Sequence, residues 1–169
     1  RTDLGHIAPG TRLDIPLYAS PLVGRTAMDL PPPLRIVLIE DNQDHAKILK
    51  WAFEQTKRQT QLTFFQDAES ALSHLCEYST GSPDVIFLDF NLPRMDGREV
   101  LRQLKSDTNS KDVPVIILSS SDREEDVKKA YELGASTYIS KSLILNELSN
   151  SLESILDYWS KIAKLPTRR

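Results

Sequence analysis

The sequence predicts a doubly wound α/β domain built on a parallel β-sheet. Segments with the character of strands alternate along the chain with segments of helical period. Several strand segments are continuous apolar runs, which is the composition of strands buried on both faces of a sheet. This alternation implies right-handed crossover connections, which place helices on both faces of the sheet.

Each expected element in the first half of the domain has its own signal. Apolar runs predict three strands, LRIVLI (34–39), LTFFQ (62–66) and DVIFL (84–88). Two helices are expected between them, over residues 42–58 and 69–78. Their apolar residues recur at helical spacing: Ile48, Leu49, Ala52 and Phe53 in the first, and Ala71, Leu72 and Leu75 in the second.

The second half of the domain repeats the alternation. Apolar runs predict two more strands, VPVIIL (113–118) and STYIS (136–140). Three helices alternate with them, over residues 97–106, 123–133 and 143–163. Gly134 directly follows the middle one of these helices, where glycine is typical of a helix end.

Residues 1–33 differ in composition from the rest of the chain. They hold six of the ten prolines and three of the six glycines, and they sustain no helical or strand period. We interpret them as an arm or linker, with two alternatives: part of the segment is not native, or its apolar residues dock on a partner. The folded domain is expected over residues 34–163, followed by a tail, 164–169, too short to form an output domain.

The composition excludes several classes of function. The formal net charge of −3 does not indicate nucleic-acid binding, for which a basic domain is expected. No apolar run approaches the roughly 20 residues of a membrane span. Cys76 is the only cysteine, so no disulfide forms within the chain, which fits a cytoplasmic location. His6, His45 and His74 lack metal-ligand spacing and are assigned surface or core roles.

Polar residues stand where the strands end. Glu40 and Asp41 follow the first strand, Asp89 the third, Ser119 the fourth, and Lys141 the fifth. In a doubly wound fold ligands bind at this edge of the sheet, so these side chains are expected to converge. Three ionised carboxylates repel one another unless a cation is present, and Mg²⁺ takes oxygen ligands and phosphate. With the mobile charge of Lys141, the set fits phosphoryl transfer, in which a carboxylate can be the nucleophile.

Each of these residues also has a purely structural interpretation. Asp41 or Asn42 could cap the first helix, and Asp89 could cap a turn. Lys141 could be an ordinary solvated lysine, and Ser119 could belong to a loop or cap the fourth helix. Taken together, the matched strand ends favour the functional interpretation, although no single residue would.

The motif D-x-N-x-P-x-x-D-G, over residues 89–97, comes directly after an apolar strand. With the acidic pair Glu40-Asp41, the hydroxyl of Ser119 and the amine of Lys141, it resembles the receiver domain of two-component response regulators over about residues 34–163. The resemblance implies a flavodoxin-like (βα)5 fold with strand order 2-1-3-4-5. The acidic pair is Glu-Asp rather than the commoner Asp-Asp, a variant that the family tolerates.

The resemblance implies a phosphorylation switch. Asp89 would be the phosphoacceptor, and Lys141 and Ser119 would contact the phosphoryl group. Ser119 and Tyr138 would form the switch that changes the surface of the fourth helix, the fifth strand and the fifth helix.

The same resemblance implies a magnesium site. Asp41 and Asp89 would hold Mg²⁺ directly, with the backbone carbonyl of Asn91 as a third protein ligand. Glu40 would act through water. Mg²⁺ is therefore the one cofactor expected.

Some features that differ from most receivers indicate a smaller group within the family. Lys141 is followed by Ser142, where most receivers have a proline preceded by a cis bond. This step, NLPRMDGREVL (91–101) and DYWSKIAKLP (157–166) resemble the single-domain regulators of phytochrome-type sensor histidine kinases. The implied partners are such a kinase as phosphoryl donor and, as one route of output, a histidine phosphotransfer protein.

The last helix carries a long apolar stripe. Its members are Leu145, Leu148, Leu152, Ile155, Trp159 and Ile162. This face packs in part on the sheet, but the helix is expected to be longer than the sheet can cover. We therefore predict a homodimer through this helix and its surroundings, although about 2.5 heptads are too few for a coiled coil.

Two other classes compete with a phosphorylated receiver. A receiver that has lost phosphorylation would be a protein-binding module, but the presence of all the key side chains argues against it. Phosphatases with an aspartate nucleophile need a second Asp two residues later, where this chain has Asn91. The chain is therefore not expected to be an enzyme beyond weak loss of its own phosphoryl group.

Overall fold

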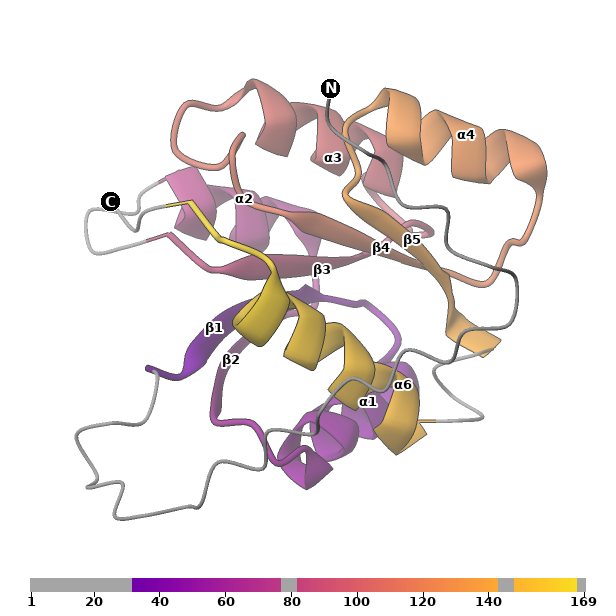
Figure 1. Cartoon of the computed structure of the whole chain (residues 1–169). Helices are drawn as coiled ribbons and strands as arrows, with labels where there is room; N and C mark the ends of the chain where they lie inside the picture. The colour runs from indigo at the N-terminus through magenta and orange to yellow at the C-terminus, as the bar shows by residue number, and fades with distance from the viewer. Residues whose placement is uncertain (1–31, 77–81, 143–147, 167–169) are drawn as a thin grey trace, which may run out of the picture. The chain divides into compact units, whose positions relative to one another are not determined.

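The computed structural model describes residues 32–76, 82–142 and 148–166 of the chain. Residues Pro32–Arg169 form one compact unit around a five-stranded sheet in the order β2-β1-β3-β4-β5, with every neighbouring pair parallel (Figure 1). This order confirms the doubly wound fold and the strand order that the receiver resemblance implies. The expected arm falls on residues 1–31, which lie outside the described residues.

The observed elements agree with the predicted ones apart from shifts of a few residues at their ends. The strands are β1 (Leu34–Ile39), β2 (Thr60–Phe65), β3 (Val85–Asp89), β4 (Val115–Ser119) and β5 (Thr137–Ser140). The helices are α1 (Gln43–Gln55), α2 (Ala68–Cys76), α3 (Gly97–Ser106), α4 (Glu124–Glu132), α6 (Leu148–Asp157) and the π-helix η2 (Tyr158–Ile162). Helix α1 ends earlier than predicted because Thr56 is extended and its hydroxyl donates to the carbonyl of Phe53.

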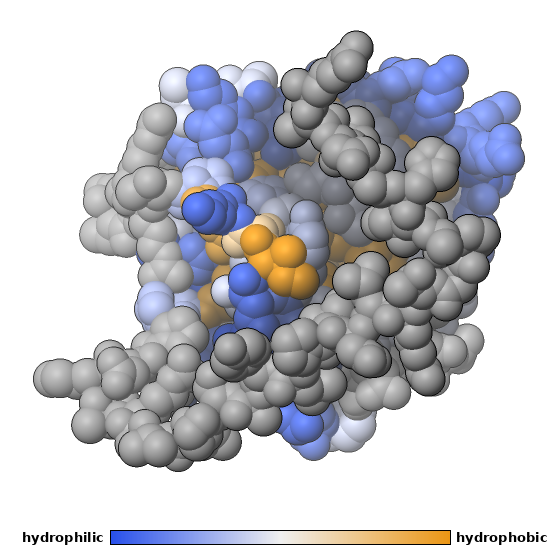
Figure 2. All heavy atoms as spheres, viewed as in Figure 1, coloured by the Kyte–Doolittle hydropathy of each residue, from blue (hydrophilic) through white to orange (hydrophobic). Residues whose placement is uncertain are grey.

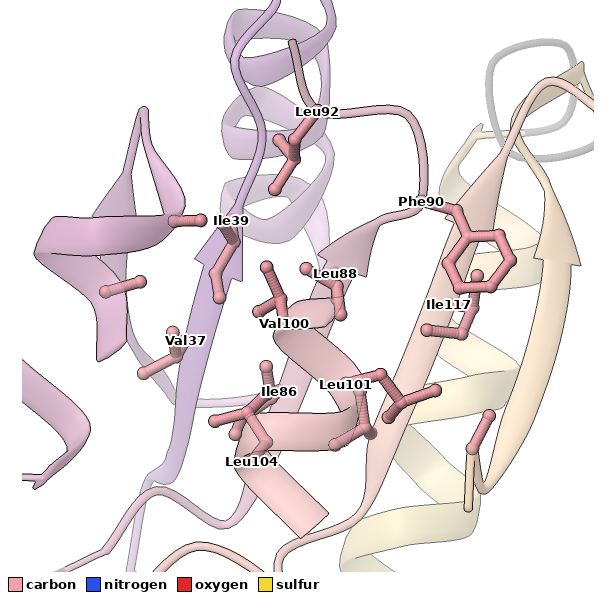
Figure 3. Packing of buried hydrophobic residues seen from close by; sticks show 14 of the residues in the cluster. Val37, Ile39, Ile86, Leu88, Phe90, Leu92, Val100, Leu101, Leu104 and Ile117 are labelled. Atoms are coloured by element: carbon pink, nitrogen blue, oxygen red, sulfur yellow. The ribbon is translucent and has the colours of Figure 1, made fainter. Parts of the chain in front are cut away.

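Two hydrophobic clusters cover the two faces of the sheet. The cluster in Figure 3 joins the sheet to α2, α3 and α4, and its strand residues are Val37, Ile39, Ile86, Leu88, Val115 and Ile117. The other joins the sheet to α1 and α6, which lie on the opposite face (Figure 1). Alternate residues of a strand point to opposite faces, and both faces of the sheet are covered by helices. All of β3, Val85–Asp89, is therefore buried. Each fully buried aliphatic or aromatic side chain contributes about 1.5–3 kcal/mol, which fixes the strand that ends at Asp89.

The last helix packs on the sheet for most of its described length. Leu152 is fully buried, and Ile155 and Trp159 pack against the same cluster. Leu152 therefore belongs to the core, which corrects its assignment to a partner face.

Apolar surface remains at the C-terminal end of this helix. Ile162 is 72% exposed and Tyr158 is 48% exposed. Figure 2 shows an apolar patch over this end of the helix, among hydrophilic residues. Leu145 and the side chain of Leu148, also predicted on the partner face, lie outside the described residues.

Three further features bear on the predictions. Gly134 follows α4 with a φ of 93°, the left-handed conformation that its predicted role at the helix end requires. The Lys141–Ser142 peptide bond is trans, as are the other peptide bonds of the described residues. No helix in the described part of the chain is long and apolar enough to cross a membrane.

Candidate functional site

The sheet brings the ends of β1, β3, β4 and β5 to one edge. Asp89 is the last residue of β3 and lies beside the end of β1, where Glu40 and Asp41 follow. Ser119 is the last residue of β4, and Lys141 directly follows β5. The structure therefore brings together the residues that were predicted from the strand ends.

Glu40, Asp41 and Asp89 form a compact acidic cluster. One carboxylate oxygen from each residue lies within 4.8 Å of the others. Glu40 and Asp89 are buried, and Asp41 is partly exposed. Asn42 is the residue that caps α1, because its side-chain oxygen accepts hydrogen bonds from two backbone N–H groups of the first turn. The carboxylate of Asp41 is thus not required as a cap.

Lys141 supplies the positive charge of the site. Its Nζ donates a hydrogen bond to Asp89 Oδ2 at 2.7 Å. It also lies 2.8 Å from Glu40 Oε2, in an ion pair rather than a well-aligned hydrogen bond. Lys141 is only 6% exposed, so the alternative of an ordinary solvated lysine is wrong.

Burial raises the pKa of Glu40 from 4.5 to about 7. Desolvation is the largest cause, and the nearby charge of Asp89 adds to it, whereas the ammonium of Lys141 acts in the opposite direction. One ammonium therefore does not compensate the buried negative charge in full. A divalent cation beside Glu40 would favour its ionised form.

We expect the stability of the metal-free protein to fall as pH rises, and Glu40→Gln to remove this dependence. Between pH 4.5 and about 7 the folded protein holds a proton on Glu40 that the unfolded chain releases. This stabilisation is fully present below the pKa of Glu40 in the unfolded chain, 4.5, and is lost as the pH rises through its pKa in the folded protein, about 7. The loss amounts to about 3 kcal/mol.

Urea unfolding in EDTA, from pH about 4.5 to about 8, measures this change. As the pH rises over that range, the free energy of unfolding of the wild-type chain should fall relative to that of Glu40→Gln. A difference that does not vary with pH would contradict the raised pKa of Glu40.

Ser119 is fully buried at the end of β4, one residue after Leu118, which pairs with Asp89. Its Oγ accepts hydrogen bonds from the backbone N–H of Ser121 at 3.1 Å and from Asn91 Nδ2 at 3.4 Å. These contacts use acceptor capacity only, so the hydroxyl proton of Ser119 can serve a further acceptor. Asp89 Oδ1 accepts from the backbone N–H of Asn91 at 2.9 Å, so Asp89 does cap a turn in addition to pairing with Lys141.

Tyr138, the predicted switch aromatic, is half-buried on β5. Its ring meets the ring of Phe90 edge-on, with centroids 6.0 Å apart. Its hydroxyl donates to the backbone carbonyl of Ser121 at 2.7 Å. Tyr138 is therefore joined to the loop that follows Ser119.

His45 belongs to the site, contrary to the surface or core role expected from the sequence. Its Nδ1 lies 3.4 Å from Lys141 Nζ and 3.5 Å from Glu40 Oε1. The available signal was its position in the first turn of the helix that directly follows the Glu40-Asp41 pair.

The acidic cluster fits a hard divalent cation. Its donors are carboxylate oxygens, which Mg²⁺ and Mn²⁺ prefer, and its negative charge exceeds that of Lys141. A hollow of about 410 Å³ adjoins Asp41, lined by residues of the loops after β2 and β3. The cluster is therefore open on the side of Asp41.

Known proteins resemble this chain in sequence and in fold. Residues 36–153 match the family model of the response regulator receiver domain. Response regulator Rcp1 of Synechocystis sp. is 33% identical over 139 residues, which cover 80% of this chain and 95% of Rcp1.

Two solved structures are also similar. The phosphorylated cyanobacterial phytochrome response regulator RcpA is 35% identical with a TM-score of 0.73, and the match covers 80% of this chain and 100% of RcpA. The Mn²⁺-bound form of Rcp1 is 31% identical with a TM-score of 0.71, with the same coverage. Since the family model spans most of the sheet and its crossovers, the chain belongs to the response regulator receiver family of two-component signalling.

Proposed function

We propose that this chain is a phosphoryl-accepting receiver, in which Asp89 takes a phosphoryl group from a phosphohistidine of a sensor histidine kinase. The observation that carries the proposal is the 2.7 Å contact between Asp89 and the buried ammonium of Lys141, beside two further carboxylates. An aspartate that only caps a turn would need neither the ammonium nor the acids around it.

Asp41 and Asp89 would hold Mg²⁺ directly, with the backbone carbonyl of Asn91 as a third ligand and Glu40 acting through water. The cation would neutralise charge on the phosphoryl oxygens. The acidic cluster supports this assignment, as does the Mn²⁺-bound form described for Rcp1.

In the transfer step, a carboxylate oxygen of Asp89 attacks the phosphorus atom. A P–O bond forms as the P–N bond breaks, and the electron pair of that bond leaves on the imidazole. If the ring is protonated at its other nitrogen, the leaving group is a neutral imidazole. The ammonium of Lys141, which is paired with Asp89 before transfer, would then pair with one phosphoryl oxygen. Ser119 would donate its hydroxyl proton to another phosphoryl oxygen.

Ser119 and Tyr138 would carry the signal away from the site. Ser121 connects them, since its N–H donates to Ser119 Oγ and its carbonyl accepts from the hydroxyl of Tyr138. A movement of Ser119 towards a phosphoryl group would therefore reach Tyr138 and the surface of α4, β5 and the helix beyond.

The kinase partner is proposed to be of the phytochrome type. This rests on the 35% identity with RcpA, which is described as a phytochrome response regulator, and on the Lys141-Ser142 step. A histidine phosphotransfer protein would be one route by which the phosphoryl group moves onward.

Incubation with acetyl phosphate, with and without Mg²⁺, tests the proposal. We expect the wild-type chain to gain the mass of one phosphoryl group only when Mg²⁺ is present, and Asp89→Asn to gain none. Asp84→Asn, at the opposite end of β3, is the matched control and should label normally. Labelling that survives Asp89→Asn would overturn the assignment of the phosphoacceptor.

We also propose a homodimer through the exposed end of the last helix. Ile162→Asp is expected to weaken dimerisation about tenfold or more, because a charge would then be desolvated in an apolar contact. Light scattering over a range of concentrations, with and without beryllofluoride, measures the effect, and Ile48→Asp on α1 is the control. A wild-type chain that stays monomeric in both states would rule the dimer out.

A further inference from the structure

Asp126, in the first turn of α4, is a buried carboxylate outside the acidic cluster. It is 6% exposed. Its Oδ1 accepts a hydrogen bond from Arg98 Nη2 at 2.5 Å, and its Oδ2 accepts from Ser121 Oγ at 2.6 Å and from Arg123 Nε at 3.0 Å. Asp126 therefore joins α4 both to α3, which carries Arg98, and to the loop after β4, which carries Ser121.

Ser121 is held from three directions by the contacts of its own atoms. Its hydroxyl donates to Asp126, its backbone N–H donates to Ser119 Oγ, and its carbonyl accepts from the hydroxyl of Tyr138. The position of Ser121 thus sets one of the two contacts in which Ser119 Oγ is the acceptor, the other coming from Asn91, and so helps to set the direction left for the hydroxyl proton of Ser119.

Arg98, on α3, connects Asp126 to the aromatic rings beside the loop after β4. Its guanidinium pairs with Asp96 as well as Asp126, and it lies 4.7 Å from the centroid of the Phe90 ring. Phe90 in turn meets the ring of Tyr138. Figure 3 shows Phe90 in the loop that follows Asp89, beside Ile117 of β4. The Arg98–Asp126 pair therefore reaches Ser121 by two routes, through Asp126 directly and through the rings of Phe90 and Tyr138.

We infer that Asp126 is a positioning residue for phosphoryl acceptance, acting through Ser121 on the hydroxyl of Ser119. The inference rests on the proposed role of Asp89 as phosphoacceptor. Asp126 keeps the loop after β4 in the conformation that presents the Ser119 hydroxyl, so that binding a phosphoryl group requires no ordering of the loop. When fewer molecules hold the competent conformation, apparent affinity falls by the same factor.

Titration with beryllofluoride, a mimic of the phosphoryl group, tests this role at saturating Mg²⁺. Asp126→Asn is expected to weaken binding of the mimic about tenfold. Its affinity for Mg²⁺ alone should be unchanged, because the acidic cluster is intact. Ser121→Ala removes the hydroxyl but keeps the ion pair of Arg98 with Asp126, so it tests the same link in a variant expected to fold.

A double variant and a control sharpen the comparison. Asp126→Asn combined with Ser121→Ala should bind the mimic no more weakly than the weaker single variant, since both break one link. Asp157→Asn is the matched control, because Asp157 on α6 also pairs with two cationic side chains, Arg58 and Lys161, and should leave binding of the mimic unchanged.

The outcomes separate the inference from the function on which it rests. Unchanged affinity for beryllofluoride in Asp126→Asn and Ser121→Ala would overturn the inference alone. A parallel loss of Mg²⁺ affinity would indicate a general structural role and would overturn it as well. A wild-type chain without Mg²⁺-dependent binding of the mimic would overturn the proposed function, and the inference with it.

Discussion

Replacement of Lys141 by Met is expected to slow phosphoryl uptake about 100-fold or more, while Mg²⁺ binding is kept or becomes tighter. The two effects have opposite signs because the ammonium has two roles. During uptake it would stabilise the charge on the phosphoryl group. In the metal-free protein it lies 2.7 Å from Asp89 and 2.8 Å from Glu40, where it competes with a cation for the same carboxylates. Met keeps most of the length of the unbranched side chain and removes the ammonium, with its charge and its N–H donors.

Initial rates with acetyl phosphate at saturating Mg²⁺ measure the first effect, and a titration with Mg²⁺ alone measures the second. Lys129→Met is the control, because Lys129 is exposed on α4 and should change neither quantity. If Lys141→Met lowered the affinity for Mg²⁺ in step with the rate, the lysine would be organising the acidic cluster rather than acting on the phosphoryl group.

The strand ends could be located from the sequence because two simple patterns coincide there. A continuous apolar run marks a strand buried on both faces, and β3 is buried along its whole length. In a parallel sheet the carboxyl ends of such strands share one edge. The residues that follow them therefore lie close together, regardless of the conformation of the loops. Asp89, Ser119 and Lys141 were predictable for this reason.

Contacts between separate crossovers could not be predicted in the same way. Arg98 and Asp126 are 28 residues apart, on α3 and α4. Helical periodicity indicates which face of each helix is buried, but it does not say which charged side chains at the edges of those faces meet. The contacts of Asp126 depend on the relative position of two helices, which is set by packing across the whole cluster on that face.

The last helix shows a different limit. A stripe that packs on a sheet and a stripe that binds a partner have the same period, so the pattern alone does not separate them. Leu152 is buried in the core cluster, whereas Ile162, in the π-helix η2, is exposed although Trp159 and Leu165 on either side of it pack against that cluster. The sequence contains the stripe, but which of its members are covered is a property of the packed structure.

Gly97→Ala is expected to destabilise the protein by about 3 kcal/mol, at the upper end of what overpacking normally costs. A Cβ atom at this position would lie 2.6 Å from the backbone oxygen of Asp89 and 2.6 Å from the Cα atom of Phe90. Both are backbone atoms, so no side chain can rotate away, and either α3 or the end of β3 must move. Because the atoms involved carry Asp89, Mg²⁺ affinity is expected to fall together with stability.

Gly134→Ala separates these two effects. Gly134 has a φ of 93°, and its added Cβ would meet only the flexible side chain of Lys105. We expect this control to lose about 1–2 kcal/mol of stability through backbone strain alone, with Mg²⁺ affinity unchanged. Urea unfolding and Mg²⁺ titration of both variants make the comparison. If Gly97→Ala lost stability but bound Mg²⁺ as the wild type does, the shift would have been taken up by α3. The close approach of the two backbones would then serve the packing of the helix and not the placement of Asp89.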